Sequence, residues 1–376
     1  MTVRGLGRIG RLPGDAARWS VVGARTRRWA PASRLFVVGD AIGWSIDDDA
    51  VHVAATARRL EISVAPASWA RFARRQAVFL PSHFSALQPL WLRSSHRLGL
   101  AYYHGRPGTP GHPEFDLALE RLRASSKRVD RVQVTHAEMH ELVVAAGVEP
   151  ERVFRIPIGI DIERFPLVDA ESRRAARAAL GVPLDAFVVG SFQKDGVGWG
   201  DGLEPKLVKG PDVLAQTLAR ARERAPELVA LLSGPARGWV RRELARRGVP
   251  FRHVRVERRE QLVRAYHALD AYLVASRQEG GPKSVLESLA SGIPLVSTRV
   301  GQAPEILEHG RTGLLADVED AEALAGHLLR VRDDAALRAA LRSAGRETAE
   351  RLAYERLDPL WAALFAGFVQ RAGDAP

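Results

Sequence analysis

Strand-sized apolar runs alternate with longer amphipathic segments along most of the sequence, and this alternation constrains the fold more than any other feature. A run that is apolar at every position suits a strand buried on both faces of a parallel sheet. The amphipathic segment after it suits the helix that crosses back over that sheet. The alternation therefore predicts an α/β protein made of βαβ units. A chain of 376 residues is long enough for two domains of ordinary size.

The first half of the sequence contains the strands and helices of one such domain. Residues 107–113 are too rich in proline and glycine to be anything but a loop, and residues 1–33 predict no definite element. The predicted strands are residues 34–40, 61–65, 77–81 and 97–105, with further strands at the start of 129–147 and of 153–166. The predicted helices are residues 48–60 and 115–127, with another at the end of 129–147.

A second alternating series follows the link at residues 153–166. Its predicted strands are residues 186–192, 228–236, 252–256, 271–276 and 293–298. Its predicted helices are residues 210–225, 237–248, 259–270, 284–291, 321–334, 335–352 and 354–371.

The two series predict two Rossmann-like, doubly wound domains. We place the first at residues 1–157 and the second at residues 158–353, and we expect the C-terminal segment 354–376 to cross back to the first domain. Ligands of doubly wound sheets bind at the carboxyl ends of the strands, so we expect both domains to face a central cleft.

The composition excludes several classes of protein. The sequence contains no cysteine, which rules out disulfides, cysteine nucleophiles and thiolate metal sites. No window approaches the roughly 18–20 uninterrupted apolar residues that a membrane span needs. The N-terminus lacks the apolar segment and cleavage site of a secretory signal. We therefore expect a cytoplasmic protein.

The charge is unevenly distributed along the chain. The net charge is +11, and residues 1–160 alone contain 23 Lys and Arg against 14 Asp and Glu. Such an excess suits nucleic acid, an anionic membrane surface or an acidic substrate, and a genome biased toward alanine and arginine would produce it as well. Four of the five lysines lie in the two segments described next, which favours a role in phosphate binding. The lysines are Lys127, Lys194, Lys206, Lys209 and Lys283.

Residues 275–298 carry two glutamates, Glu279 and Glu287, on either side of Lys283. A predicted strand ends at the start of this segment, a Gly-Gly-Pro loop follows, and a helix then begins. Glycines let the backbone approach a ligand closely, and the amides and dipole at a helix start attract an anion. With an ammonium group just ahead of the helix, this segment would accept a diphosphate.

Each of the two glutamates also has a purely structural explanation. Ser284 and Glu287 match the S-x-x-E capping box, in which the glutamate only satisfies the amide at the helix N-cap. Glu279 could be a solvated carboxylate in an exposed loop. Neither residue identifies a function by itself.

A second glycine-rich segment, residues 189–214, also ends where a helix begins. It contains Lys194, Lys206 and Lys209 and again suggests phosphate binding. It lacks the Walker and G-x-G-x-x-G patterns, which disfavours an NTPase or a dehydrogenase. We expect Lys209 and Lys283 to face one shared pyrophosphate.

These segments resemble the retaining GT-B glycosyltransferases of the family 4 type, the glycosyl transferases group 1. The similarity rests on "EGGPKSVLE", on "SLASGIPLVSTRVGQAPEILEHGRTGLL" after it and "VRAYHALDAYLVASR" before it, on "GSF…KG" and on the link "IPIGIDIERF". In the first half, "YYHG" is similar to the His-Gly loop of that family. The resemblance covers residues 34–370 and is most specific in residues 256–315.

The resemblance implies the GT-B fold and a nucleotide-diphosphate sugar donor held mainly by the second half. Glu287 would bind the ribose hydroxyls, Glu279 a sugar hydroxyl, and Lys209 the diphosphate. The family usually has an arginine where this chain has Ser191, so we expect Lys194 to supply the missing charge. The loop at residues 256–258 should meet the base, and the amides of residues 281–285 should face the sugar and diphosphate.

The resemblance thus implies a set of site residues. The implied catalytic residues are His104, Glu279 and Lys209, although a satisfied structural role explains the histidine nearly as well. The implied donor-binding residues are Ser191, Gln193, Lys194, Lys209, Val256, Gly280, Gly281, Pro282, Lys283, Ser284, Val285 and Glu287.

Transfer from such a donor releases a nucleoside diphosphate, so catalysis must stabilise negative charge on the β-phosphate. Lysines and helix-end amides can do this without a metal, and the acidic run at residues 47–49 opens a helix, where it suits the dipole. We therefore expect neither a metal nor a cofactor. The resemblance implies transfer with retention, in which the leaving phosphate helps to deprotonate the acceptor.

Candidate acceptor-binding residues follow the first clear strand and are Asp40, Gly43 and Trp44. The indole could stack on a sugar and the carboxylate could bind a hydroxyl, and a turn or core role explains both equally well. The acceptor would be a glycan, a lipid-linked saccharide or a small natural product. The basic first half could rest on an anionic membrane.

Three other functions stay open from the sequence. An epimerase or phosphorylase of similar shape would need a base or cofactor lysine in the cleft. A nucleic-acid-binding protein would need aromatic residues interleaved with basic ones, whereas the tryptophans here are scattered, so we expect no nucleic acid partner. A non-catalytic nucleotide-sugar-binding protein fits the same residues.

Overall fold

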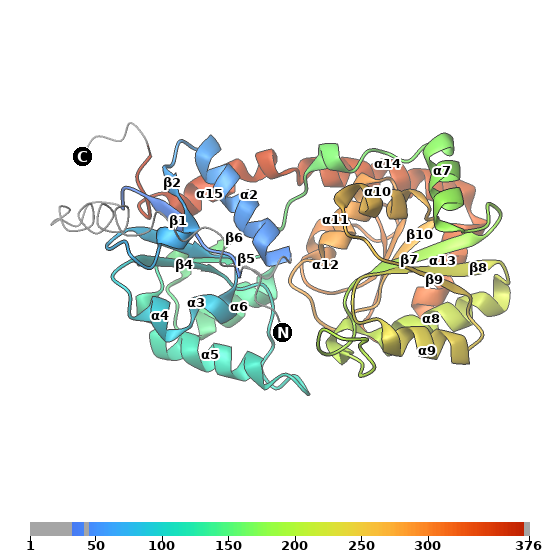
Figure 1. The fold of residues 1–376 in the computed structure, drawn as a ribbon, viewed down its shortest axis with the longest axis horizontal. Helices are drawn as coiled ribbons and strands as arrows, with labels where there is room; N and C mark the ends of the chain where they lie inside the picture. Colours follow the sequence, from blue (N-terminus) through green and yellow to red (C-terminus); the bar gives the residue numbers. More distant parts are fainter. Residues whose placement is uncertain (1–31, 41–44, 372–376) are drawn as a thin grey trace, which may run out of the picture. The chain divides into compact units, whose positions relative to one another are not determined.

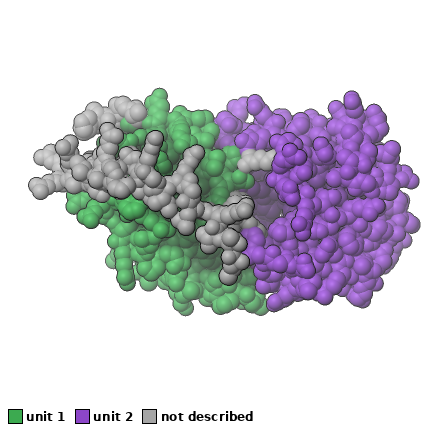
Figure 2. All heavy atoms as spheres, viewed as in Figure 1, with its two compact units in different colours: residues 1–156, 357–376 green, residues 157–356 purple. Residues whose placement is uncertain are grey.

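The computed structural model describes residues 32–40 and 45–371. The chain forms two compact units (Figure 2). Unit 1 contains the residues up to Ile156 together with those from Leu357 onward, and unit 2 is Pro157–Arg356. The divisions predicted from the sequence fall after residues 157 and 353, and those of the structure fall after residues 156 and 356.

The described residues of unit 1 form a six-stranded parallel sheet in the order β2-β1-β3-β4-β5-β6. Its central strands are short and apolar, as strands covered on both faces must be. The strands are β1 Leu35–Val37, β2 Val64–Ala65, β3 Ala77–Leu80, β4 Arg97–Ala101, β5 Arg131–Val134 and β6 Val153–Arg155.

Helices cover both faces of this sheet (Figure 1). On one face lie α3 His83–Ala86, α4 Pro89–Leu92, α5 Pro113–Ser125 and α6 Ala137–Ala145, which share one apolar core with the strands. On the other lie α2 Ser45–Arg59 and α15 Asp358–Phe365. Arg59 of α2 binds both carboxylate oxygens of Asp358 with N···O distances of 2.8 and 2.6 Å. The end of the chain therefore belongs to the first domain.

The described residues of unit 2 form a second six-stranded parallel sheet, in the order β12-β11-β10-β7-β8-β9. The strand order reverses between β7 and β10, because the chain builds outward through β8 and β9 and then crosses to β10. The strands are β7 Phe187–Phe192, β8 Leu228–Ser233, β9 Phe251–Val254, β10 Ala271–Val274, β11 Leu295–Thr298 and β12 Leu314–Ala316.

Helices also cover the sheet of unit 2 (Figure 1), and two apolar cores hold them to it. One core contains residues of α8 Pro211–Arg224, α9 Gly238–Arg246 and α13 Ala321–Asp333. The other contains residues of α7 Ala170–Leu180, α10 Arg259–His267, α11 Lys283–Ala290, α12 Ala303–Ile306 and α14 Ala335–Arg351.

The fold class predicted from the sequence is confirmed, since both units are Rossmann-like α/β layers around a parallel sheet. Several element bounds differ. The helix predicted over residues 354–371 ends at Phe365, because the segment after it passes through Gly367 at φ +67° and forms isolated bridges from Val369 to Ala32 and from Arg371 to Ile62. The strand predicted at residues 61–65 is only β2. Helix α7 and strand β12 were not predicted.

None of the helices in the described ranges has both the length and the apolar character needed to cross a bilayer.

Candidate functional site

The reversal of strand order in unit 2 places a candidate site at the carboxyl ends of β7 and β10. Doubly wound sheets bind ligands at this switch point, because the loops leaving the two central strands diverge to opposite faces and leave a crevice. The loop after β7 carries Lys209 and the loop after β10 carries Glu279. Both glycine-rich segments singled out in the sequence therefore start from neighbouring strands.

Lys209 and Glu279 form an ion pair at this point. The Lys209 Nζ lies 2.8 Å from Oε1 and 2.7 Å from Oε2 of Glu279, and Ser276 Oγ donates to Oε1 at 2.8 Å. The side chains of the lysine and the glutamate are 27% and 10% exposed. The structural explanation that Glu279 is a solvated carboxylate is therefore wrong, since an ammonium group and a hydroxyl hold a carboxylate that is nearly buried.

Backbone contacts between the two loops produce this pairing. The amides of Arg277 and Gln278 donate to the Val208 carbonyl at 2.9 and 3.2 Å. Gly210 has a φ of +58°, and a Cβ at this position would lie 1.9 Å from the Ala275 carbonyl oxygen. A glycine is required here because an L side chain would push the loops apart and separate the ion pair.

Glu287 lies on α11 and accepts a hydrogen bond of 2.7 Å from the Tyr266 hydroxyl of α10. Burial and the nearby Glu287 carboxylate raise the pKa of Tyr266 well above its usual value, so the hydroxyl stays a donor. Helix α11 begins at Lys283 with Pro282 as its N-cap, and within the described residues no side chain caps it. The capping-box explanation for Ser284 and Glu287 is therefore wrong.

The glycine loop before α11 is held by Gln302. The backbone amide of Gln302 donates to the Gly280 carbonyl at 3.0 Å. A Cβ on Gly281 would lie 2.7 Å from the Gln302 side chain. The Val285 amide donates to the Pro282 carbonyl at 3.0 Å. Of the amides at residues 281–285 that we expected to face the donor, that of Val285 is thus used in the first turn of the helix.

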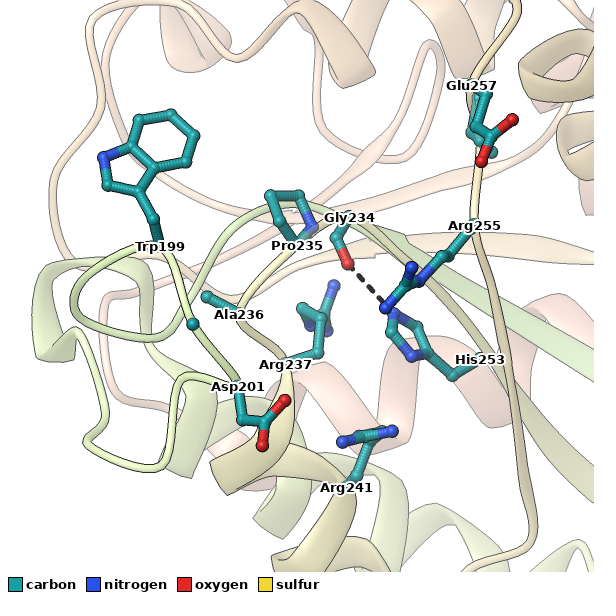
Figure 3. Close-up of a pocket in the computed structure, with 12 residues that line it drawn as sticks. Trp199, Asp201, Gly234, Pro235, Ala236, Arg237, Arg241, His253, Arg255 and Glu257 are labelled. Atoms are coloured by element: carbon teal, nitrogen blue, oxygen red, sulfur yellow. Dashed lines mark hydrogen bonds between the residues drawn. The ribbon is translucent and has the colours of Figure 1, made fainter. Parts of the chain in front are cut away.

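A pocket of about 630 Å³ opens beside the carboxyl ends of β8 and β9 (Figure 3). This volume suits a small organic ligand. Val256, which we expected near a nucleotide base, lies on its wall. The lining residues come from the loops after β7, β8 and β9, from β9 and from α9, and they are Trp199, Gly200, Asp201, Gly234, Pro235, Ala236, Arg237, Arg241, His253, Arg255, Val256 and Glu257.

Gln193 connects this pocket to the ion pair. Its side-chain amide donates to the Lys209 carbonyl at 3.1 Å, and its backbone amide donates to the Ser233 carbonyl at 3.2 Å. Gly234, which lines the pocket, packs so closely on the Gln193 carbonyl that a Cβ there would approach its oxygen to 2.4 Å. The pocket and the ion pair are therefore neighbouring parts of one loop assembly.

Arg237 is a pocket residue that the sequence did not reveal. Its side chain is buried, and one guanidinium nitrogen donates to the carbonyls of Ser191, Gln193 and Ser233 at 2.7, 3.1 and 3.0 Å. The other donates to the Ser191 hydroxyl at 3.3 Å. Ser191 is itself 2% exposed. In this structure its hydroxyl accepts a hydrogen bond from Arg237. A contact between Ser191 and a donor stays a prediction.

The charges around Arg237 are shielded from water. Its Nε lies 3.0 Å from the Asp195 carboxylate, and both side chains are almost fully buried. Burial raises the pKa of Asp195 even though the guanidinium lowers it. His253 Nε2 donates to the Gly234 carbonyl at 2.9 Å. Burial lowers the His253 pKa below 6.5, so the ring is neutral at pH 7.

Lys194 lies against the pocket rim. Its Nζ is 4.4 Å from the centre of the Trp199 ring, within the range of a cation–π contact. Lys283 is the first residue of α11 and is half-buried. The prediction that Lys194, Lys209 and Lys283 share one diphosphate stays a prediction.

In unit 1, His104 lies in a cluster of aromatic rings after β4. Its ring is 6.0 Å from that of His83, 6.1 Å from Phe84 and 5.6 Å from Phe115, all edge to face. The His83 ring stacks on Tyr102 with centres 4.0 Å apart. Burial lowers the pKa of His83 well below 6.5, and the neighbouring His104 lowers it further.

Asp40 follows β1, is half-buried and accepts a hydrogen bond from Ser85 Oγ. Gly43 and Trp44, the other candidate acceptor residues, lie outside the described residues. Across the described part of the chain, no group of three or more histidine, aspartate and glutamate side chains is placed to hold a metal ion.

Comparison with known proteins finds one family model and a set of curated relatives that each match part of this chain. Residues 202–334 match the family described as "Glycosyl transferases group 1". The chain is 33% identical over 241 residues to the D-inositol 3-phosphate glycosyltransferase of Saccharomonospora viridis, covering 60% of this chain and 53% of that protein. It is 31% identical over 263 residues to the corresponding protein of Xylanimonas cellulosilytica, covering 66% of this chain and 59% of that protein. The chain thus spans about half the length of the curated relatives it matches.

Solved structures share the whole fold. Anabaena Alr3699/HepE, solved in complex with UDP and glucose, has a TM-score of 0.70 at 17% identity, covering 89% of this chain and 99% of that one. The sucrose-phosphate synthase of Thermosynechococcus elongatus has a TM-score of 0.62 at 22% identity, covering 78% of this chain and 73% of that one. The two parallel sheets are those of the GT-B fold, and within that fold residues 202–334 are similar to the glycosyl transferases group 1 family.

Proposed function

We propose that this protein is a glycosyltransferase that moves a sugar from a nucleotide-diphosphate sugar to a hydroxyl group of an acceptor. The observation that carries this proposal is the Lys209–Glu279 ion pair at the switch point of the unit 2 sheet, joined through Gln193 to a pocket of nucleoside size. The names of the relatives and the UDP complexes of Alr3699/HepE support the same class of reaction.

The proposed roles follow from the chemistry of the leaving group. As the bond from the sugar to the diphosphate breaks, negative charge develops on the β-phosphate oxygen, and a preorganised ammonium group stabilises it. Glu279 holds the Lys209 ammonium in place with contacts of 2.8 and 2.7 Å. Glu279 would also accept a hydroxyl of the sugar, and Glu287, held by Tyr266, would accept hydroxyls of the ribose.

Other parts of this proposal rest on the family resemblance. We propose retention of the anomeric configuration, transfer without a metal ion or cofactor, and a catalytic role for His104. The acceptor, a glycan, a lipid-linked saccharide or a small natural product, would contact Asp40 in unit 1. A cytoplasmic location and contact with an anionic membrane through the basic first half stay predictions.

The function is tested by measuring thermal unfolding in the presence of UDP-, GDP-, ADP- and TDP-sugars. A ligand that binds only the folded protein raises its melting temperature, so one base should produce a clear shift. Lys209→Ala should weaken binding of that donor about 10- to 100-fold, since hydrogen bonds to charged groups contribute about 1.5–3 kcal/mol. Lys127→Ala, which removes an exposed lysine of unit 1, is the matched control and should bind normally.

The proposal fails if no nucleotide sugar stabilises the protein, or if Lys209→Ala binds the donor as tightly as Lys127→Ala does. A separate arm adds EDTA: donor binding and slow release of the nucleoside diphosphate should continue, and a requirement for added Mn²⁺ would contradict transfer without a metal.

A further inference from the structure

The segment between β7 and Lys209 folds into a short hairpin that we call the Trp199 loop, residues 194–206. The Val197 amide donates to the Glu204 carbonyl at 2.9 Å, and the Lys206 amide donates to the Asp195 carbonyl at 2.7 Å. Gly196 and Pro205 form an isolated antiparallel bridge. The Trp199 loop is thus a formed structural element.

The Trp199 loop is also fastened to the start of α9. The amides of Gly238 and Trp239 donate to the carbonyls of Asp201 and Gly202 at 2.6 and 2.8 Å. A Cβ on Gly202 would lie 2.1 Å from the Ala236 carbonyl oxygen, so the hairpin rests directly on the loop after β8. The amides at the start of α9 are occupied by protein carbonyls, and the hairpin becomes one wall of the pocket.

Trp199 stands at the tip of this hairpin and lines the pocket (Figure 3). Its side chain is 60% exposed, an unusual position for a large aromatic group that would release free energy on burial. Gly198 has a φ of +74°, and a Cβ on either Gly198 or Gly200 would meet no atom within 4 Å. The backbone on either side of Trp199 therefore borders open space, and the exposed indole stands at the pocket wall.

The rest of the pocket suits a nucleoside. Pro235 and Val256 supply apolar surface, while Arg241, His253 and Arg255 supply polar and positively charged groups. The lysine at residue 194, whose Nζ lies 4.4 Å from the centre of the indole, adds positive charge at the same rim. A planar heterocycle attached to an anionic tail fits both features of this lining.

We propose that Trp199 stacks on the base of the bound nucleoside diphosphate and that the Trp199 loop is the element that distinguishes nucleotides from bare phosphate groups. This inference rests on the proposed function, because it takes the nucleotide to be the donor's. Stacking on an aromatic side chain contributes about 1–3 kcal/mol per base. The diphosphate is bound separately, at Lys209.

The test compares two ligands on the full-length protein by isothermal titration calorimetry. One is the nucleoside diphosphate of the sugar that stabilises the wild-type protein, and the other is inorganic pyrophosphate. Trp199→Ala should lower the affinity for the nucleoside diphosphate by about 10-fold or more and change the affinity for pyrophosphate by less than about 2-fold. Trp199→Phe should recover part of the loss, because a smaller ring still stacks. Lys209→Ala should lower the affinity for both ligands.

Leu184→Ala is the matched control, since Leu184 is 63% exposed and precedes β7, at the opposite end of the strand from the pocket. It should leave both affinities unchanged. Because Trp199 is exposed, its variants should keep the wild-type melting temperature, and a loss of binding would not reflect unfolding.

The inference is overturned if Trp199→Ala binds the nucleoside diphosphate as the wild type does, or if it weakens pyrophosphate to the same degree. These outcomes are separable from failure of the proposed function, in which the wild-type protein itself binds no nucleotide or nucleotide sugar.

Discussion

At the scale of single residues, two carboxylates have different partners, one in the loop after β10 and the other on α11. Glu279 is paired with the ammonium of Lys209, whereas Glu287 receives the hydroxyl of Tyr266. A charged partner compensates the charge of a carboxylate, and a hydroxyl donor fixes its orientation. We therefore expect Glu279 to matter for both stability and ligand binding, and the Tyr266 hydroxyl to fix the position of Glu287.

Tyr266→Phe tests the orienting role. The substitution keeps the buried ring and removes only the hydroxyl, so the Glu287 carboxylate loses a fixed donor. We expect affinity for the donor sugar nucleotide to fall about 10-fold or more, since a hydrogen bond to a charged group contributes about 1.5–3 kcal/mol. Titration of the donor into wild-type and variant protein measures the change.

Tyr102→Phe is the control for that substitution. Tyr102 is a buried tyrosine of unit 1 whose hydroxyl has no hydrogen-bond partner among the described residues, and burial raises its pKa to about 12. Removing this hydroxyl should leave donor affinity unaltered. Equal donor affinities in Tyr266→Phe and the wild type would show that the tyrosine does not position Glu287 for binding.

At the scale of elements, the site depends on how the turn before α8 meets the loop after β10. Gly210 is the residue between the Leu207–Lys209 turn and α8, and it contacts the backbone of Ala275 directly. This close approach lets the Val208 carbonyl reach the amides of Arg277 and Gln278. The ion pair between Lys209, the last residue of this turn, and Glu279 is thus a consequence of packing between two backbone segments.

Gly210→Ala should therefore disrupt the site, and Gly181→Ala provides the comparison. Both glycines have left-handed backbones, with φ of +58° and +61°, but a Cβ on Gly181 would meet nothing within 4 Å. Each variant carries the left-handed strain of about 1 kcal/mol. Gly210→Ala should lose about 1–3 kcal/mol more because of the clash, and it should bind the donor poorly.

Denaturant unfolding and donor titration of the two glycine variants measure these effects. If both variants lose the same free energy of unfolding and retain donor affinity, the contact with Ala275 does not hold the site together.

At the scale of the whole molecule, histidines that are buried in unit 1 and half-buried in unit 2 link stability to pH. Burial lowers the pKa values of His83 and His96 in unit 1 and of His253 and His327 in unit 2 below 6.5. In the folded protein these rings take up protons at a lower pH than in the unfolded chain, where protonation sets in near pH 6.5. The unfolded state then carries more bound protons, so the free energy of unfolding decreases as the pH falls below that value.

His83→Phe should flatten this dependence. Phenylalanine preserves the ring stacked on Tyr102 and cannot bind a proton. Each buried histidine contributes at most about 1.4 kcal/mol per pH unit, so the variant should lose less stability than the wild type between about pH 7.5 and 5.5. Urea unfolding at the two pH values measures the difference, and parallel decreases would contradict a neutral, buried His83.

The local pattern of the sequence predicted much of the architecture and some of the site. Apolar runs identified the strands of both sheets because burial of a parallel strand on both faces shows in a few consecutive residues. The two glycine-rich segments follow neighbouring strands, and their binding of one shared ligand stays a prediction. The C-terminal helix was predicted too long, because the residues after Phe365 have helical periodicity but bridge to Ala32 and Ile62 instead.

The errors and omissions at the site have a common origin. The spacing of Ser284 and Glu287 suggests a capping box, yet α11 begins at Lys283. The partner of Glu287 is instead the hydroxyl of Tyr266, on the preceding helix α10. Arg237 was one arginine among many in a helix-like stretch, and nothing local to it indicates that three carbonyls surround its guanidinium. Partners that are distant in the sequence leave no local pattern.

The sequence alone determined that this protein is two parallel α/β sheets with glycine-rich loops after two of the strands, because hydrophobic periodicity and glycine-rich turns are properties of neighbouring residues. Only the tertiary structure decided which side chains meet. Lys209 reaches Glu279 across 70 positions of sequence, and Trp199 reaches the pocket lined by Arg237 and His253. Those contacts depend on strand order and on the close approach of separate backbone segments, which folding in three dimensions sets.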